Sequence, residues 1–154
     1  MRFSELFDEE SVVCGLKSDD RAGCFREILD QLVVTKKITA ALSETAFVAI
    51  QNRERVGSTG IGCGVAIPHV KTPEAKKLIA TVGIHHTGVD FKAIDSELVR
   101  IVFLIIRPND ESGEHLKFLQ WISRLGRSAD FRRFMANANS RSEMVSLLHE
   151  MHEV

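Results

Sequence analysis

The stretch ELVRIVFLII at residues 97–106 is almost continuously apolar and rich in β-branched side chains. Such a run is typical of a central strand, because a strand with one exposed face shows a polar residue at every second position. Pro108, which has no backbone N–H to donate, follows and closes the run. The stretch LIATVGIHH at 78–86 has a similar composition. We therefore predict two strands here, with residues 97–106 at the centre of a sheet.

Helical spacing of apolar residues appears upstream of these strands. One helix is predicted over about 18–36, with Ser18 or Asp19 as its N-cap. Its apolar face consists of Phe25, Ile28, Leu29 and Leu32. A second helix is predicted from near Ser43 to the charged stretch NRER at 52–55. The expected apolar face of this second helix is Ala46, Phe47 and Ile50.

Downstream of the strands, a further helix is predicted over 114–127. The apolar residues at helical spacing in it are Leu116, Leu119, Ile122 and Leu125. Two shorter helical patterns follow in FRRFM at 131–135 and SEMVSLLHEM at 142–151, and a short strand is expected in SVVCGL at 11–16. This order of elements indicates one α/β domain, residues 1–154, in which helices cover a sheet.

The composition restricts the classes of protein that fit. The 154 residues are 44% hydrophobic and 27% charged, with a net charge of −1 and scattered basic residues, which argues against a nucleic-acid partner. No apolar run approaches the ~20 residues of a membrane span, and the first ten residues lack the features of a signal peptide. Cys14, Cys24 and Cys63 are odd in number and far apart, as expected for free thiols in a reducing compartment. We expect a cytoplasmic protein that does not insert into membranes.

The glycine-rich stretch GSTGIGCGVAIPH at 57–69 is predicted to be a loop that binds an anion. Glycines leave backbone N–H groups open to a ligand, and two hydroxyl groups add donors. The candidate phosphate-binding residues are Gly57, Ser58, Thr59, Gly60, Gly62 and Gly64. The stretch lacks the G-K-[ST] of a nucleotide-binding P-loop and the setting of a dinucleotide fingerprint, so nucleotide binding is not expected.

His69 ends this stretch and is the candidate nucleophile. Pro68 before it has a fixed φ and stiffens the chain, so the imidazole is held beside the proposed phosphate loop. A neutral imidazole nitrogen can form a covalent intermediate near pH 7. The alternative for any single histidine is an exposed or merely hydrogen-bonded side chain.

Three stretches of the chain resemble the enzyme IIA domains of the bacterial phosphoenolpyruvate-dependent phosphotransferase system, fructose/mannitol class, and in particular their nitrogen-regulatory branch. They are RERVGSTGIGCGVAIPHVK at 53–71, VDFKAID at 89–95 and EHLKFLQWISRL at 114–125. The resemblance implies a mixed sheet flanked by helices in a sandwich. It also implies phosphorylation of the histidine in A-I-P-H, here His69, by a small histidine-containing phosphocarrier protein.

The same resemblance implies two supporting residues. The histidine of the H-L-x-x-L motif, His115, would lie beside His69 and help to fix its tautomer or the phosphate. The arginine that opens R-E-R, Arg53, would approach the phosphoryl group, although Arg55 competes for this role. Glu54 between them is expected to pair with a nearby charge. Transfer between histidines needs no metal and no cofactor, and none is expected.

The chain also departs from the family pattern. Gly62, Cys63 and Gly64 stand where nitrogen-regulatory relatives usually show G-N-G, and Val70 replaces a common glycine after the histidine. The family's D-G-x-x-V reads DSELV at 95–99. We consider two readings of Cys63: a reactive thiol, or a buried packing residue, which is the more common environment of cysteine.

The remaining histidines are interpreted as surface residues. His85 and His86 should point to opposite faces of a strand, and His149 and His152 have no further metal ligand in view.

Two functional classes remain open for the chain. One is a phosphoryl carrier, either a regulator or the IIA component of a fructose/mannitol-type sugar uptake system. The other is a binding module with the same fold that recognises an anion or a partner without transferring a phosphoryl group.

Overall fold

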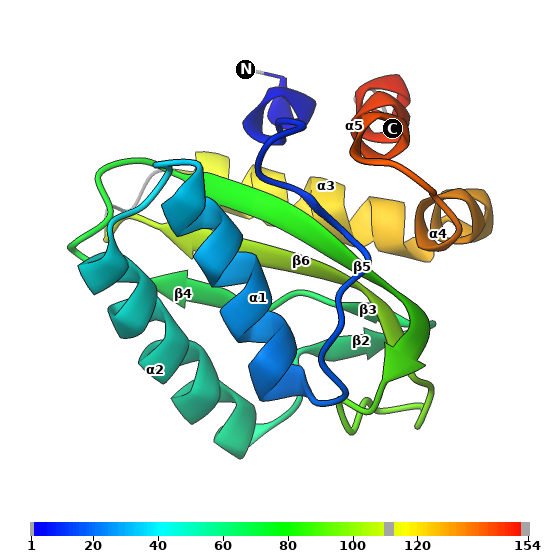
Figure 1. Cartoon of the computed structure of the whole chain (residues 1–154), viewed down its shortest axis with the longest axis horizontal. Coiled ribbons are helices and arrows are strands. Elements are labelled where there is room, and N and C mark those ends of the chain that lie inside the picture. Colours follow the sequence, from blue (N-terminus) through cyan, green and yellow to red (C-terminus); the bar gives the residue numbers. More distant parts are fainter. Residues whose placement is uncertain (1, 110–112, 152–154) are drawn as a thin grey trace.

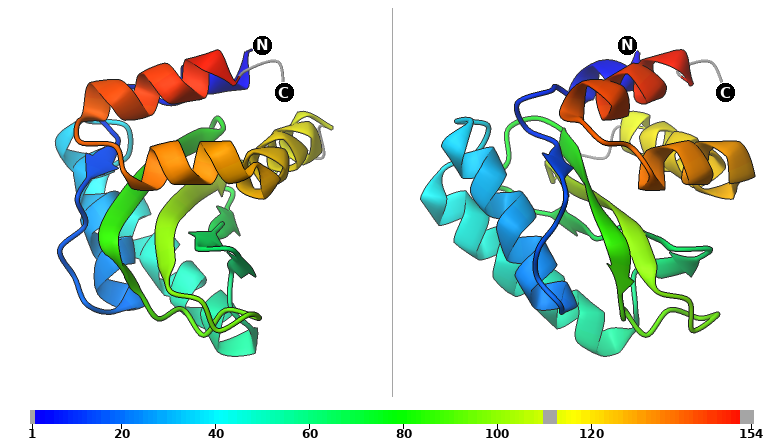
Figure 2. Two further views of the ribbon diagram at one scale, coloured as in Figure 1. Left: turned by 90° about the vertical axis from the view of Figure 1, so that its right-hand side faces the viewer. Right: turned by 45° about the vertical axis from the view of Figure 1, so that its right-hand side comes forward.

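The computed structural model of the chain describes residues 2–109 and 113–151. In chain order the elements are η1 (Phe3–Leu6), β1 (Val13–Cys14), α1 (Arg21–Val34), α2 (Ala40–Val56), β2 (Gly60–Gly62), β3 (Val65–Ala66), β4 (His69–Lys71), β5 (Ile79–Val89), β6 (Val99–Arg107), α3 (Glu114–Arg127), α4 (Ala129–Ala136) and α5 (Arg141–Glu150). The sheet lies between two helical layers (Figures 1 and 2): α1 and α2 cover one face, and α3, α4 and α5 cover the other. The predicted α/β class is confirmed.

The central position predicted for residues 97–106 is confirmed by the strand order β1-β5-β6-β3-β2, with β4 also paired to β6. The sheet is mixed, because β5 runs antiparallel to β6 whereas β3 and β4 both run parallel to it. One strand therefore carries the pairing of three neighbours, and β4 adjoins its carboxyl end.

Alternate side chains of β6 enter two separate hydrophobic clusters. Ile101, Phe103 and Ile105 pack toward α3, α4 and α5, together with Trp121. Val102, Leu104 and Ile106 pack toward α1 and α2. Both faces of β6 are covered, which is the physical reason for its continuous apolar sequence.

The helix starts differ slightly from the predicted ones. Asp20, rather than Ser18 or Asp19, caps α1 by accepting a hydrogen bond from Gly23 N at 2.7 Å. Likewise α2 begins at Ala40, ahead of Ser43, because the Thr39 hydroxyl accepts from Leu42 N at 3.0 Å. The predicted apolar residues of α1 are all buried.

The predicted bounds of α3 are confirmed, but its buried face is shifted around the helix. Leu116, expected to be inside, is 62% exposed. The face that packs on the sheet consists of His115, Phe118, Trp121, Ile122 and Leu125. None of the helices within residues 2–109 and 113–151 combines the length and the apolar character that crossing a bilayer requires.

The expectation of a continuous loop at 57–69 is wrong, because the stretch contains the strands β2 and β3 and ends on the first residue of β4. β2 and β3 form a hairpin whose two connecting residues, Cys63 (φ 58°) and Gly64 (φ 82°), both have positive φ. This is the requirement of a type I′ turn. The turn is held by Asp95 Oδ2, which accepts from Cys63 N at 2.8 Å. This hydrogen bond from the Cys63 backbone is the largest cause that lowers the pKa of the Asp95 carboxyl, and the bond from Glu97 N is the second.

We expect Cys63→Asn to raise the free energy of unfolding by up to about 1 kcal/mol, because asparagine tolerates the left-handed conformation better than other non-glycine residues. Chemical denaturation with an unchanged m-value would measure the gain. Cys63→Ala is the matched control, since it removes the thiol and keeps the backbone penalty. An equal gain in Cys63→Ala would show that the thiol, not the backbone, carries the cost.

Candidate functional site

His69 is the first residue of β4 and is half-buried. Its ring nitrogen Nδ1 lies 2.9 Å from the carbonyl oxygen of Ile67. A carbonyl oxygen can only accept, so in the neutral ring Nδ1 carries the proton and Nε2 keeps its lone pair. The backbone around the ring is tied to the centre of the sheet, because Ile105 N donates to Pro68 O at 3.0 Å. The expected strand-like setting of His69 is confirmed.

His115 lies on the same face of the sheet as His69. In the parallel register of β4 with β6, His69 is paired with Ile105, which points toward the α3 side. His115, in the first turn of α3, is 6% exposed and belongs to the face of that helix that packs on the sheet. The register and Figure 1 place β4 and the start of α3 at the same end of β6. The fold thus brings the two histidines to one end and one face of the sheet.

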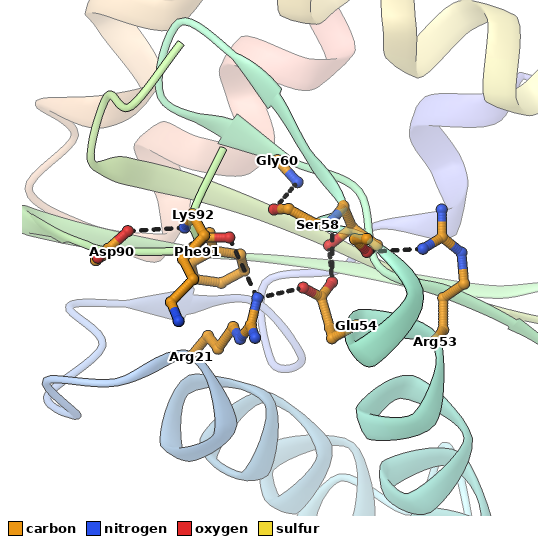
Figure 3. A network of polar contacts seen from close by, with 10 residues as sticks. Arg21, Arg53, Glu54, Ser58, Gly60, Asp90, Phe91 and Lys92 are labelled. Carbon is orange, nitrogen blue, oxygen red and sulfur yellow. Dashed lines mark hydrogen bonds and ion pairs between the residues drawn. The ribbon is translucent and has the colours of Figure 1, made fainter. Parts of the chain in front are cut away.

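Arg53 comes from the last turn of α2, the helical layer on the opposite face of the sheet, and is exposed. Its Nη1 donates to Gly57 O at 2.7 Å, which closes the end of the helix (Figure 3). A guanidinium has five N–H donors, so this bond leaves others for a ligand. An arginine at a helix C-terminus is also favourable to the helix dipole.

Several donors of the proposed phosphate loop are already used within the chain. Thr59 donates both its backbone N–H, at 3.1 Å, and its hydroxyl to Glu54 Oε1. Gly60 N donates to Ser58 Oγ at 2.9 Å, which leaves the Ser58 hydroxyl proton available to another acceptor. Gly62 precedes the hairpin turn and Gly64 is its second residue, and their positive φ values meet a backbone requirement there. Phosphate binding by these residues remains a prediction.

Glu54 pairs with a charge, as expected, and its partner is Arg21 of α1 at 2.9 Å (Figure 3). Arg21 was not singled out from the sequence. A signal for the burial of Glu54 was nevertheless present, because Ala46, Ile50 and Glu54 are spaced four residues apart and all three are buried. Glu54 therefore lies on the buried face of α2, in line with its apolar residues.

His85 and His86 point to opposite faces of β5, as predicted, but the interpretation of His85 as a surface residue is wrong. It is 6% exposed, and its two ring nitrogens contact Ser18 O at 3.0 Å and Gly88 N at 2.9 Å, so burial leaves neither nitrogen unpaired. His86 is exposed and contacts Ala138 O. His152 lies outside the described residues. Across residues 2–109 and 113–151 there is no group of three His, Cys, Asp or Glu residues arranged to hold a metal ion.

The three free cysteines occupy different environments. Cys63 is exposed, so the buried-packing interpretation of this residue is wrong. Cys24, in contrast, is a buried packing residue. Burial is the main cause that raises the pKa of its thiol to about 12, and the nearby carboxylates add to the increase. Burial also raises the pKa of the partly buried Cys14 thiol.

We expect Cys63 to be alkylated faster than Cys14 and Cys24 in the native protein at neutral pH. The thiolate is the reacting form, and Cys63 alone of the three thiols is exposed. Competitive labelling with light and heavy iodoacetamide, read by peptide mass spectrometry, would measure the three rates. The unfolded protein in denaturant is the control, where the three rates should converge. A native Cys63 that reacts no faster than Cys14 contradicts the expectation.

Comparison with known proteins agrees with this architecture. The family model of the phosphoenolpyruvate-dependent sugar phosphotransferase system, EIIA 2, matches residues 5–151. A nitrogen regulatory protein of Bradyrhizobium diazoefficiens is 28% identical over 148 residues, covering 96% of this chain and 95% of that protein. One from Klebsiella oxytoca is 36% identical over 128 residues, covering 80% of this chain and 76% of that protein.

Among solved structures, the nitrogen regulatory protein IIA-Ntr of Neisseria meningitidis is similar, with a TM-score of 0.79 and 26% identity over 94% of this chain and 97% of that one. The family model covers nearly the whole chain, and the nitrogen regulatory proteins match over most of their own length. The chain therefore belongs to the EIIA 2 family of the phosphoenolpyruvate-dependent sugar phosphotransferase system, within its nitrogen-regulatory branch.

Proposed function

We propose that the chain accepts a phosphoryl group on Nε2 of His69 from a histidine phosphocarrier protein and later passes it on. The observation that carries this proposal is the hydrogen bond between His69 Nδ1 and Ile67 O at 2.9 Å. It keeps the lone pair on Nε2, the nitrogen that the backbone bond leaves available for reaction. The family assignment supports a phosphoryl-carrying role for the chain.

The transfer would exchange one N–P bond for another. The Nε2 lone pair attacks phosphorus, the bond from phosphorus to the donor histidine breaks, and the donor imidazole recovers its electron pair. Positive charge develops on the His69 ring as Nε2 bonds to phosphorus, and the Nδ1–H group already faces a carbonyl oxygen that stabilises this charge. No proton has to leave His69 during the step.

Catalysis of such a step depends mainly on positioning and on neutralising the oxygens of the transferred group. We assign His115 to contacts with the phosphoryl group or with His69, since both histidines lie on one face and at one end of the sheet. Arg53, through the N–H groups that do not bind Gly57 O, and the Ser58 hydroxyl are the proposed further donors. A metal or cofactor has no role in this scheme.

The biological role that we propose is regulation, in line with the nitrogen regulatory proteins that match the chain. The sugar-uptake alternative uses the same chemistry and is less favoured, because these regulatory relatives match over most of their length. The proposal includes a cytoplasmic location, which the free thiols of Cys14, Cys24 and Cys63 support. The regulated downstream protein would be recognised by the surface around the phosphorylated ring.

The direct test is incubation of the wild-type chain with phosphoenolpyruvate, the first enzyme of the system and the phosphocarrier protein. Intact-mass spectrometry at alkaline pH should show one added phosphoryl group that is lost in acid, and peptide mapping should locate it on His69. Omission of the phosphocarrier is the control and should leave the chain unmodified. A fully folded chain that gains no phosphoryl group would instead identify a binding module.

A further inference from the structure

We propose that the ion pair between Arg21 and the buried Glu54 is a positioning device for His69, acting through Thr59 and Ile67 to hold the imidazole in its reactive tautomer. The consequence for phosphoryl transfer rests on the proposed function. The consequence for the tautomer does not, because it concerns the unphosphorylated chain. Neither Arg21 nor Glu54 belongs to the set of groups proposed above to contact the phosphoryl group.

The first part of the device is the carboxylate of Glu54, which is 5% exposed and has both oxygens engaged. Oε2 accepts from Arg21 Nη1 at 2.9 Å, and Oε1 accepts from the Thr59 backbone N–H at 3.1 Å and from the Thr59 hydroxyl. Arg21 Nη1 also donates to Phe91 O at 3.2 Å (Figure 3). The Glu54 carboxylate thus joins α2 to α1 and to the residue before β2, and Arg21 extends the connection to the segment after β5.

The second part connects Thr59 to the reactive ring. Ile67 N donates to Thr59 O at 3.0 Å, and Ile67 O faces His69 Nδ1 at 2.9 Å. Ile67 is therefore held on its N–H side by the residue that Glu54 fixes, and on its carbonyl side it is the acceptor that sets the tautomer of His69. A shift of Thr59 moves this acceptor relative to the imidazole.

The charge of Glu54 is essential to this arrangement. A buried carboxylate is tolerated only when a cation and hydrogen-bond donors compensate for its lost hydration. Glu54→Gln leaves the shape of the side chain nearly unchanged. The carboxylate only accepts hydrogen bonds, whereas the amide has a donor NH₂ group, and this group would face the donors of Arg21 or Thr59. The contact to Arg21 or a contact to Thr59 therefore has to break, and any contact that Thr59 keeps is weaker because its acceptor no longer carries a charge.

The chain offers a matched control between the same two helices. Arg26 of α1 and Glu44 of α2 form an ion pair at 2.8 Å, and both side chains are substantially exposed. Exposed pairs contribute little to stability. Glu44→Gln therefore removes a carboxylate from α2 and breaks a bridge to α1 that lies outside the chain of hydrogen bonds from Glu54 through Thr59 to Ile67.

The experiment compares wild type, Glu54→Gln, Arg21→Gln and Glu44→Gln by ¹⁵N NMR of the histidine rings. In wild type and Glu44→Gln the neutral His69 ring should be mainly in the Nδ1–H tautomer. In Glu54→Gln and Arg21→Gln the fraction of the Nε2–H tautomer should rise. Arg21→Lys, which keeps the positive charge, should restore most of the wild-type population.

The rate of phosphorylation by the phosphocarrier should fall about tenfold in Glu54→Gln, which is in the lower range of losses for residues that orient a reactive group. The rate should remain unchanged in Glu44→Gln. A folded Glu54→Gln or Arg21→Gln variant with wild-type tautomer populations overturns the inference. If Glu54→Gln fails to fold, Arg21→Gln and Arg21→Lys decide it. A wild-type chain that is never phosphorylated overturns the proposed function, whereas the tautomer result still tests the positioning role.

Discussion

Replacing His69 with alanine is expected to abolish phosphorylation of the chain by the phosphocarrier protein. The substitution removes the nitrogen that would form the covalent bond, so no residual rate is expected from the groups that surround it. The fold should survive, because the ring is half-buried and the backbone of β4 stays paired with β6. The measurement is intact-mass spectrometry over a time course, with the thermal unfolding midpoint as the test of folding.

His86→Ala is the matched control for this substitution. His86 is an exposed histidine on β5 whose ring contacts Ala138 O at 3.0 Å. Its replacement removes a histidine of the same chemistry and should leave the phosphorylation rate at the wild-type value. Equal phosphorylation of the folded His69→Ala variant and wild type would show that another nucleophile accepts the group.

Replacing His115 with alanine is expected to slow phosphorylation by about 10²-fold and not to abolish it. A positioned imidazole next to the reacting centre stabilises charge that develops in the transition state, and loss of one such group costs about this much. His115 is buried in the first turn of α3, and this helix covers the face of the sheet on which His69 lies. This location supports the role. Single-turnover phosphorylation by purified phosphocarrier would measure the change in rate.

The burial of His115 requires a control that separates catalysis from stability. Truncation of a 6% exposed side chain leaves a cavity, so the unfolding free energy of His115→Ala is expected to fall as well. Phe118→Leu, one turn further along the buried face of α3, disturbs the packing without removing a polar group. A wild-type phosphorylation rate in folded His115→Ala, or an equal loss in Phe118→Leu, would refute the specific role of His115.

Those parts of the fold that depend on local periodicity could be predicted from the sequence. The central strand at 97–106, the bounds of the helix at 114–127 and the buried face of α1 all follow from the spacing of apolar residues over one or two turns or pleats. The A-I-P-H motif likewise indicated His69, since Pro68 imposes its restraint on the adjacent residue. In each case the residues that determine the feature are neighbours in the chain.

Other features depend on partners that are distant in sequence, and only the tertiary structure decided them. The turn at Cys63 is held by Asp95, and the charge of Glu54 is compensated by Arg21 of α1. The burial of His85 likewise depends on Ser18, whose carbonyl oxygen contacts its Nε2 from α1's side of the sheet. A polar group can be buried only where the folded chain supplies a hydrogen-bond partner or an opposite charge. The spacing of residues within one segment does not predict which distant residue will be that partner.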